Sequence, residues 1–272
     1  MKWIRLVLNI VVYLATFYAA MIIHDRVYIK FDAYKDMLDR NGPMWMITVL
    51  TTSYVLLLGV FWFKRFFFKS EGLFRMCRFQ PISRSAVGWL TVTGILCAVF
   101  FVSLIQISFL KSNFPALNEY VEIFMGDSFV ITLLGAVVFG VLYEETLFRG
   151  LILNELRRTG MPLVAAMIIH ALVYAYFQPS LPISCIAFFL AIMYTLIYNR
   201  LQSIWATIYT AAIVNSLIFT LRKLGAYDMI AKWNDIALIA IALLSIAGII
   251  SILAILYRSD KQVQITRTEV PV

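Results

Sequence analysis

Charge is scarce in this sequence. Only 14% of its 272 residues are charged, while 62% are hydrophobic. An ordinary soluble domain is near half apolar and carries about a quarter charged residues. The composition therefore excludes an ordinary soluble domain and predicts a protein that has the lipid bilayer as its solvent.

Cysteine, internal symmetry and clustered basic charge are also lacking. The three cysteines lie in apolar runs (Cys97 and Cys185) or in a loop (Cys77), which argues against a disulfide framework. No internal repeat or pair of interrupted helices is visible, so a small-solute transporter is the least favoured class. The net charge of +8 is not gathered on a face with soluble aromatic residues, so we expect no nucleic-acid partner.

Long apolar runs dominate what is present. Eight segments are long and apolar enough to span a bilayer as helices, and no alternating barrel pattern is visible. The segments are Ile4–Ile23, Met44–Phe63, Ala86–Leu110, Phe129–Leu153, Met161–Phe177, Leu181–Tyr198, Ile204–Leu221 and Ile236–Tyr257. We predict an all-α integral membrane protein, a bundle of about eight transmembrane helices.

The chain divides by content into three parts. Residues 1–128 hold three helices and loops, residues 129–221 hold the spans that carry polar residues, and residues 222–272 hold the last helix and a polar tail. With the N-terminus in the cytoplasm, fourteen basic residues fall inside and eight outside. The positive-inside rule then predicts that both termini are cytoplasmic.

The stretch YEETLFRG, Tyr143 to Gly150, places three charges within a predicted span. A charged group near the middle of a spanning helix costs ~2.5–3.5 kcal/mol on insertion scales, so these side chains must face the bundle interior. Glu145 and Arg149 are four residues apart and are predicted to form an ion pair. Glu144 lies about 100° round the helix from Glu145 and has no local partner.

Two other spans carry polar residues at a similar depth. Counted from the cytoplasmic ends of their segments, Glu144 and His170 both lie ~13 Å deep and Asn215 lies ~16 Å deep. We therefore expect the three side chains to converge within the reach of one water. A glutamate in such a pocket can act as a general base that activates water and later protonates a leaving amine. The alternative is that the buried charges only orient helices and that His170 is a hydrogen-bonded core residue.

Glu144, Glu145 and Arg149 match the EExxxR motif of the CPBP family, which contains CAAX proteases and bacteriocin-processing enzymes of the Abi type. The chain resembles this family over about residues 129–221. The resemblance implies an intramembrane peptidase fold of eight helices and a substrate that is a membrane-associated protein or peptide. It also implies localisation in a bacterial plasma membrane.

The other family motifs place further residues. FxxxH falls on Ala166 to His170, with the histidine kept, and HxxxN falls on Ala211 to Asn215, with the asparagine kept. The resemblance implies that Glu144, His170 and Asn215 are catalytic, and that Glu145 and Arg149 support them.

The chain departs from the family at Ala211, where the third motif has a histidine. A catalytic zinc takes three protein ligands, whereas Glu144 and His170 are the only candidates here, so we expect no tightly bound metal and no other cofactor. Two readings stay open. The chain is an intramembrane endopeptidase, slow or specialised, or it is an inactive family member that serves as a membrane scaffold or regulator of an envelope or signalling protein.

Overall fold

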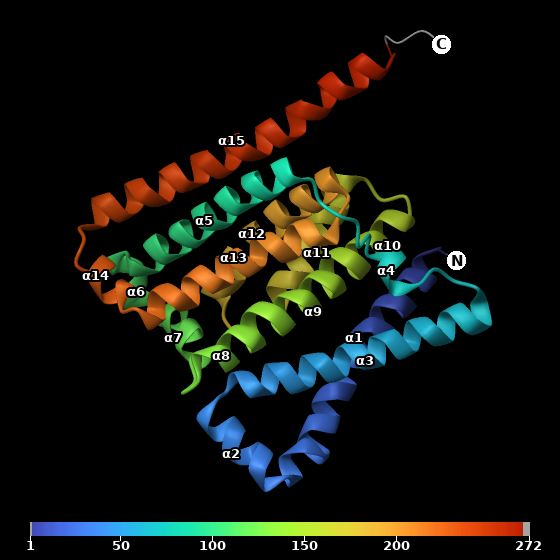
Figure 1. The fold of residues 1–272 in the computed structure, drawn as a ribbon, viewed down its shortest axis with the longest axis horizontal. Coiled ribbons are helices and arrows are strands. Elements are labelled where there is room, and N and C mark those ends of the chain that lie inside the picture. The colour runs from blue at the N-terminus through green and yellow to red at the C-terminus, as the bar shows by residue number, and fades with distance from the viewer. Residues whose placement is uncertain (1, 269–272) are drawn as a thin grey trace.

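The computed structural model describes residues 2–268, with side chains through Arg258, and every regular element in this range is helical. The main helices form a bundle in which α5, α13 and α15 run side by side and α1 crosses α3 at an angle (Figure 1). They are α1 (Lys2–Arg26), α3 (Pro43–Phe68), α5 (Arg84–Gln106), α11 (Leu163–Tyr176), α12 (Leu181–Leu201), α13 (Ile204–Lys223), α15 (Asp235–Thr268) and a composite segment from Phe129 to Arg158. Short helices join them: η1 (Tyr28–Lys30), α2 (Asp32–Arg40), α4 (Leu73–Met76), α6 (Ser108–Asn113), α7 (Ala116–Ile123) and α14 (Ala226–Ile230).

The all-α membrane architecture predicted from the sequence is confirmed, with one difference in helix length. Seven helices of the described chain are long and apolar enough to cross a membrane. The eighth, α11, has 14 residues. At 1.5 Å per residue it spans ~21 Å, less than the ~30 Å of a bilayer core. The chain is an integral membrane protein in which α11 is shorter than the predicted span and keeps an exposed apolar face, with Val164 61% and Leu172 56% exposed.

The composite fourth segment is irregular and longer than predicted. It runs through α8 (Phe129–Thr132), η2 (Leu133–Gly140), α9 (Val141–Glu145), η3 (Thr146–Ile152) and α10 (Leu153–Arg158), and so continues five residues beyond the predicted end at Leu153. Both η2 and η3 are π-helical. Such stretches are rare and often mark functional sites. The two glutamates lie on α9, between them.

Close approach of backbones fixes the helix that carries Asn215. A Cβ built on Gly94 of α5 would lie 2.8 Å from Cγ2 of Ile213 on α13, so only glycine permits this packing. A Cβ on Gly248 of α15 would likewise lie 2.8 Å from Cδ1 of Leu96 on α5. Helix α5 is therefore held between α13 and α15, as Figure 1 shows.

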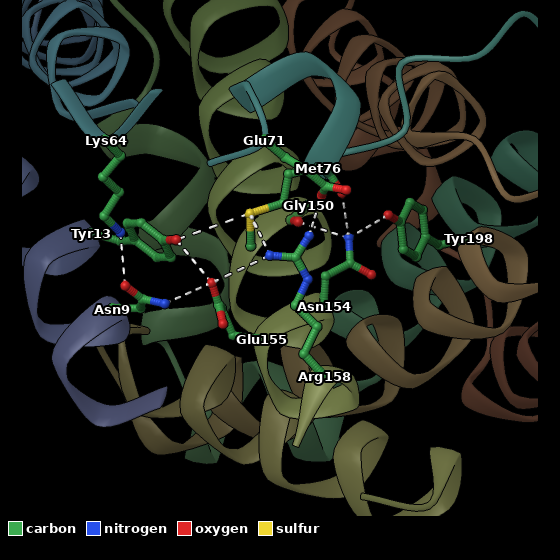
Figure 2. Close-up of polar contacts among 10 residues, drawn as sticks. All are labelled: Asn9, Tyr13, Lys64, Glu71, Met76, Gly150, Asn154, Glu155, Arg158 and Tyr198. Atoms are coloured by element: carbon green, nitrogen blue, oxygen red, sulfur yellow. Dashed lines mark hydrogen bonds and ion pairs between the residues drawn. The ribbon is translucent and has the colours of Figure 1, made fainter. Parts of the chain in front are cut away.

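One end of the bundle gathers the N-terminus, the end of α3, and α4 and α10 (Figure 1). Asn154 joins α10 to α4 and α12 near this end. Its Nδ2 donates to the carbonyl of Met76 at 2.9 Å and to Oη of Tyr198 at 2.7 Å, as Figure 2 shows. This end holds the residues predicted to be cytoplasmic, whereas α2, α7 and α14 lie at the other end.

Candidate active site

The ion pair expected from the spacing of Glu145 and Arg149 is present. Oε1 of Glu145 lies 2.9 Å from Nη1 of Arg149, and both side chains are almost fully buried. The guanidinium of Arg149 lies over two aromatic rings, 4.5 Å from the centroid of Tyr174 and 5.2 Å from that of Tyr194. A buried cation over aromatic faces gains up to ~2 kcal/mol from each ring. The pair joins η3 to α11 and α12.

Glu144 faces a different partner. Oη of Tyr174, on α11, donates a hydrogen bond of 2.9 Å to Oε2 of Glu144. The carboxylate is only partly buried, because it lines an internal cavity of about 110 Å³. One water needs roughly 10–15 Å³ of such space, so the cavity is large enough for several waters.

Helix α13 supplies the opposite wall of this cavity. Asn215 and Ala211 both line it, one helical turn apart. Nδ2 of Asn215 donates to the carbonyl of Ala136, in the π-helical η2, at 3.3 Å. The structure thus brings Glu144, Ala211 and Asn215 to the lining of one cavity.

His170 lies outside the lining of that cavity. Its ring is fully buried, with Nδ1 3.3 Å from Oγ1 of Thr195 and the ring edge-on to Phe148. Nε2 of His170 has no hydrogen-bond partner among the described residues. The structure therefore does not place His170 at a common water with Glu144 and Asn215. Tyr174, one turn further along α11, holds that position.

Helix boundaries explain why Tyr174 replaces His170 at this depth. Because the composite segment ends at Arg158, Glu144 lies up to ~21 Å from that end rather than ~13 Å. Helix α11 begins at Leu163, which puts His170 at ~10 Å but Tyr174 at ~16 Å, the depth of Asn215 on α13. Sequence reasoning missed Tyr174. It shares a helix face with His170, four residues away, and this spacing is the signal that could have identified it.

The donor set does not fit a catalytic metal. No three His, Cys, Asp or Glu side chains of the described residues lie close enough together to hold an ion. Glu145 forms an ion pair with Arg149, and His170 is not among the residues that line the cavity with Glu144. A catalytic zinc needs three protein ligands, so no step below passes through a metal.

Residues 126–217, about a third of the chain, match the family model described as type II CAAX prenyl endopeptidase Rce1-like. The model that this segment matches belongs to the CPBP family. Neither the curated proteins nor the solved structures include a match to the chain. The matched segment contains both glutamates, Arg149 and Asn215, and it is similar to the domain of an intramembrane peptidase family.

Proposed function

We propose that this chain is an intramembrane endopeptidase that hydrolyses a membrane-associated protein or peptide. The observation that carries the proposal is the position of Glu144. It is a carboxylate inside a membrane-spanning bundle, and it faces a cavity that is large enough for several waters and is also lined by Asn215. A charge placed in this way is costly to bury, and intramembrane ionisable groups commonly serve a function.

In the proposed reaction Glu144 takes a proton from a water in the cavity, and the water oxygen attacks the carbonyl carbon of the scissile peptide bond. The hydroxyl of Tyr174 orients the carboxylate. The amide of Asn215 faces the cavity and can donate to the oxyanion that forms. When the C–N bond breaks, Glu144 returns the proton to the leaving amine, so that one water is consumed and a carboxylic acid and an amine are released. His170 packs against Phe148 and Thr195, and in this proposal it supports the site without touching the reacting atoms.

The alternative function expected from the sequence rests on Ala211. The motif histidine of the CPBP family would lie where Ala211 lines the cavity, and its loss removes an imidazole next to the attacking water. Losing one preorganised electrostatic group commonly costs ~10²–10³ in rate. The second candidate is therefore an inactive CPBP-family member that binds a membrane or envelope protein without cutting it.

Restoring the imidazole tests the peptidase proposal directly. We expect Ala211→His to raise hydrolysis of a membrane-anchored substrate by about tenfold or more, because the new side chain enters the cavity one turn from Asn215. The measurement is the cleavage rate of a prenylated CAAX peptide in proteoliposomes. The matched control is Ala212→His, which adds the same imidazole one residue away, outside the cavity lining. Equal rates for the two variants and the original chain would count against the proposed site.

The proposal also includes orientation, with both termini in the cytoplasm. We expect Lys35→Cys to react with an impermeant thiol reagent on intact cells, and Arg258→Cys to react only after lysis. Cys77 and Cys97 are buried, and burial raises the pKa of the Cys77 thiol, so at neutral pH it stays protonated and unreactive. Cys185 is exposed and is replaced by serine beforehand. Labelling at position 258 but not at position 35 would reverse the orientation.

A further inference from the structure

A second, larger cavity opens at the end of the bundle that carries the N-terminus. It lies between the start of α1, the end of α3 and the end of α10, and its volume is about 1220 Å³. Ligand pockets for small molecules run to about 1,000 Å³. The space therefore suits a ligand with a bulky head or an attached chain. None of its lining residues belongs to the cavity that Glu144 faces.

The charge of this groove is strongly positive. Its lining includes five cationic side chains and two carboxylates, Glu71 and Glu155. The cationic side chains are Lys2, Arg5, Lys64, Lys69 and Arg158.

Both carboxylates are already engaged, as Figure 2 shows. Oε1 of Glu155 accepts from Nδ2 of Asn9 at 2.9 Å and from Oη of Tyr13 at 3.0 Å. Glu71 forms an ion pair with Arg158. Glu155 also lies 3.9 Å from Nη1 of Arg158. Five cations against two carboxylates still leave the groove with a net charge of +3.

The floor also fixes Lys64 in place. Its Nζ donates to Oδ1 of Asn9 at 2.7 Å and lies 4.8 Å from the centroid of the Tyr13 ring. Arg5 and Lys69, by contrast, are exposed and form no ion pair within the described part of the chain. A fixed ammonium flanked by free cations is a site for an anion.

Exposed apolar side chains also line the groove and form its rim. Ile4, Leu8 and Phe68 line it, with exposed fractions of 67%, 59% and 72%. Phe66 and Phe67, beside Phe68 at the end of α3, are also exposed, as expected for an aromatic belt at the membrane–water interface. The cations therefore lie at the level of lipid headgroups, and the apolar rim is continuous with the surface that acyl chains cover.

We propose that this groove binds the headgroup of an anionic phospholipid, with the phosphate among Arg5, Lys64 and Lys69 and an acyl chain along the exposed face of α1. Basic pockets between transmembrane helices on the cytoplasmic side are a general form of anionic-lipid recognition. The attached chain explains the apolar rim, which a soluble phosphate would not use. Glu155 and Arg158 belong to α10, so the bound lipid contacts the same composite segment that carries Glu144.

Lipid binding to the purified full-length chain in a neutral detergent tests the proposal. The measurement is native mass spectrometry during titration with phosphatidylglycerol or phosphatidylcholine. We expect the first phosphatidylglycerol to bind at least about tenfold more tightly than phosphatidylcholine. In the double variant Arg5→Gln/Lys69→Gln this preference should fall by about tenfold to thirtyfold, as expected for the loss of two interfacial cations. Each single variant should lose part of it.

Two double variants serve as controls. Lys35→Gln/Arg40→Gln removes the same residue types from the exposed surface of α2, and Arg5→Lys/Lys69→Arg keeps the charge; both should retain the preference. Equal loss in the α2 variant, or no loss in the groove variant, would overturn the proposal. So would equal binding of the two lipids, which would indicate an unspecific apolar crevice. Displacement by inorganic phosphate at lipid-like concentrations would instead indicate a soluble anion and would also overturn it.

Discussion

Replacing Glu144 by glutamine is expected to remove proteolysis and leave the fold intact. Glutamine has nearly the same volume and its carbonyl oxygen can still accept the hydrogen bond from Tyr174. It cannot take a proton from water, however. Loss of a general base commonly costs 10²–10⁴ in rate, so we expect a fall of about 10³ or more in kcat with a thermal midpoint close to that of the original chain.

The measurement does not require a known substrate. Mass spectrometry of the new termini of membrane proteins, compared between cells that express the original chain and cells that express Glu144→Gln at matched abundance, reports every cleavage that depends on Glu144. Asp36→Asn, an equivalent change on the exposed surface of α2, is the control and should leave the termini unchanged. Tyr174→Phe keeps the ring beside Arg149 but removes the hydroxyl, and we expect it to slow cleavage less than Glu144→Gln does.

The same variant separates the two candidate functions. If Glu144→Gln restores the role of the chain in cells that lack it, no proteolysis was needed and the scaffold reading stands. If it fails to restore that role at normal abundance, a pure scaffold is ruled out. The conservative change matters here because a larger one would disturb the packing of Glu144 against Tyr174 and confuse loss of chemistry with loss of fold.

The sequence predicted the elements that depend on long apolar runs and on spacing within one helix. The membrane-spanning segments follow from hydropathy, and the Glu145–Arg149 pair follows from a four-residue interval on one face. Such features depend on local chemistry, which a single sequence contains. The expectation that Glu144 and Asn215 lie close together depended on comparing depths between helices. In the structure both residues line one cavity.

The depth of His170 shows where this reasoning fails. Hydropathy ended the fourth span at Leu153, because Asn154 and Glu155 look like the start of a polar loop. In the structure the helix continues, because both side chains find buried partners, Asn154 at Met76 and Glu155 at Tyr13. An error of five residues is more than one helical turn. Because of this error we expected His170 beside Glu144, whereas the structure places Tyr174 there.

The π-helical stretches were not visible in the sequence either. Hydrophobic periodicity cannot distinguish η2 from an ordinary helix, since LLGAVVFG is apolar on every side. Its position reflects tertiary contacts. A Cβ on Gly135 would come within 2.7 Å of the carbonyl of Pro43 on α3, and the carbonyl of Ala136 accepts from Asn215. These contacts join residues far apart in the chain, which no local pattern records.

Removing the positive charge of Arg149 is expected to have the largest effect on stability. In Arg149→Met the carboxylate of Glu145, which is 2% exposed, loses its partner. Breaking a buried pair from one side costs ~3–5 kcal/mol, and the contacts of the guanidinium with the Tyr174 and Tyr194 rings are lost as well. We expect the thermal midpoint of the purified protein to fall by roughly 6–20 °C and its abundance in membranes to fall in parallel.

Two further variants separate the charge from the loss of packing. Arg157→Met makes the same change at an exposed position of α10 and should shift the midpoint by no more than about 2 °C. The double variant Glu145→Gln/Arg149→Met removes both charges and should recover much of the loss, because a neutral amide is far cheaper to bury than an unpaired carboxylate. Recovery should remain incomplete, since the two tyrosine rings still lack their cation. A double variant as unstable as Arg149→Met alone would show that Arg149 stabilises the bundle through packing, and that its charge does not serve Glu145.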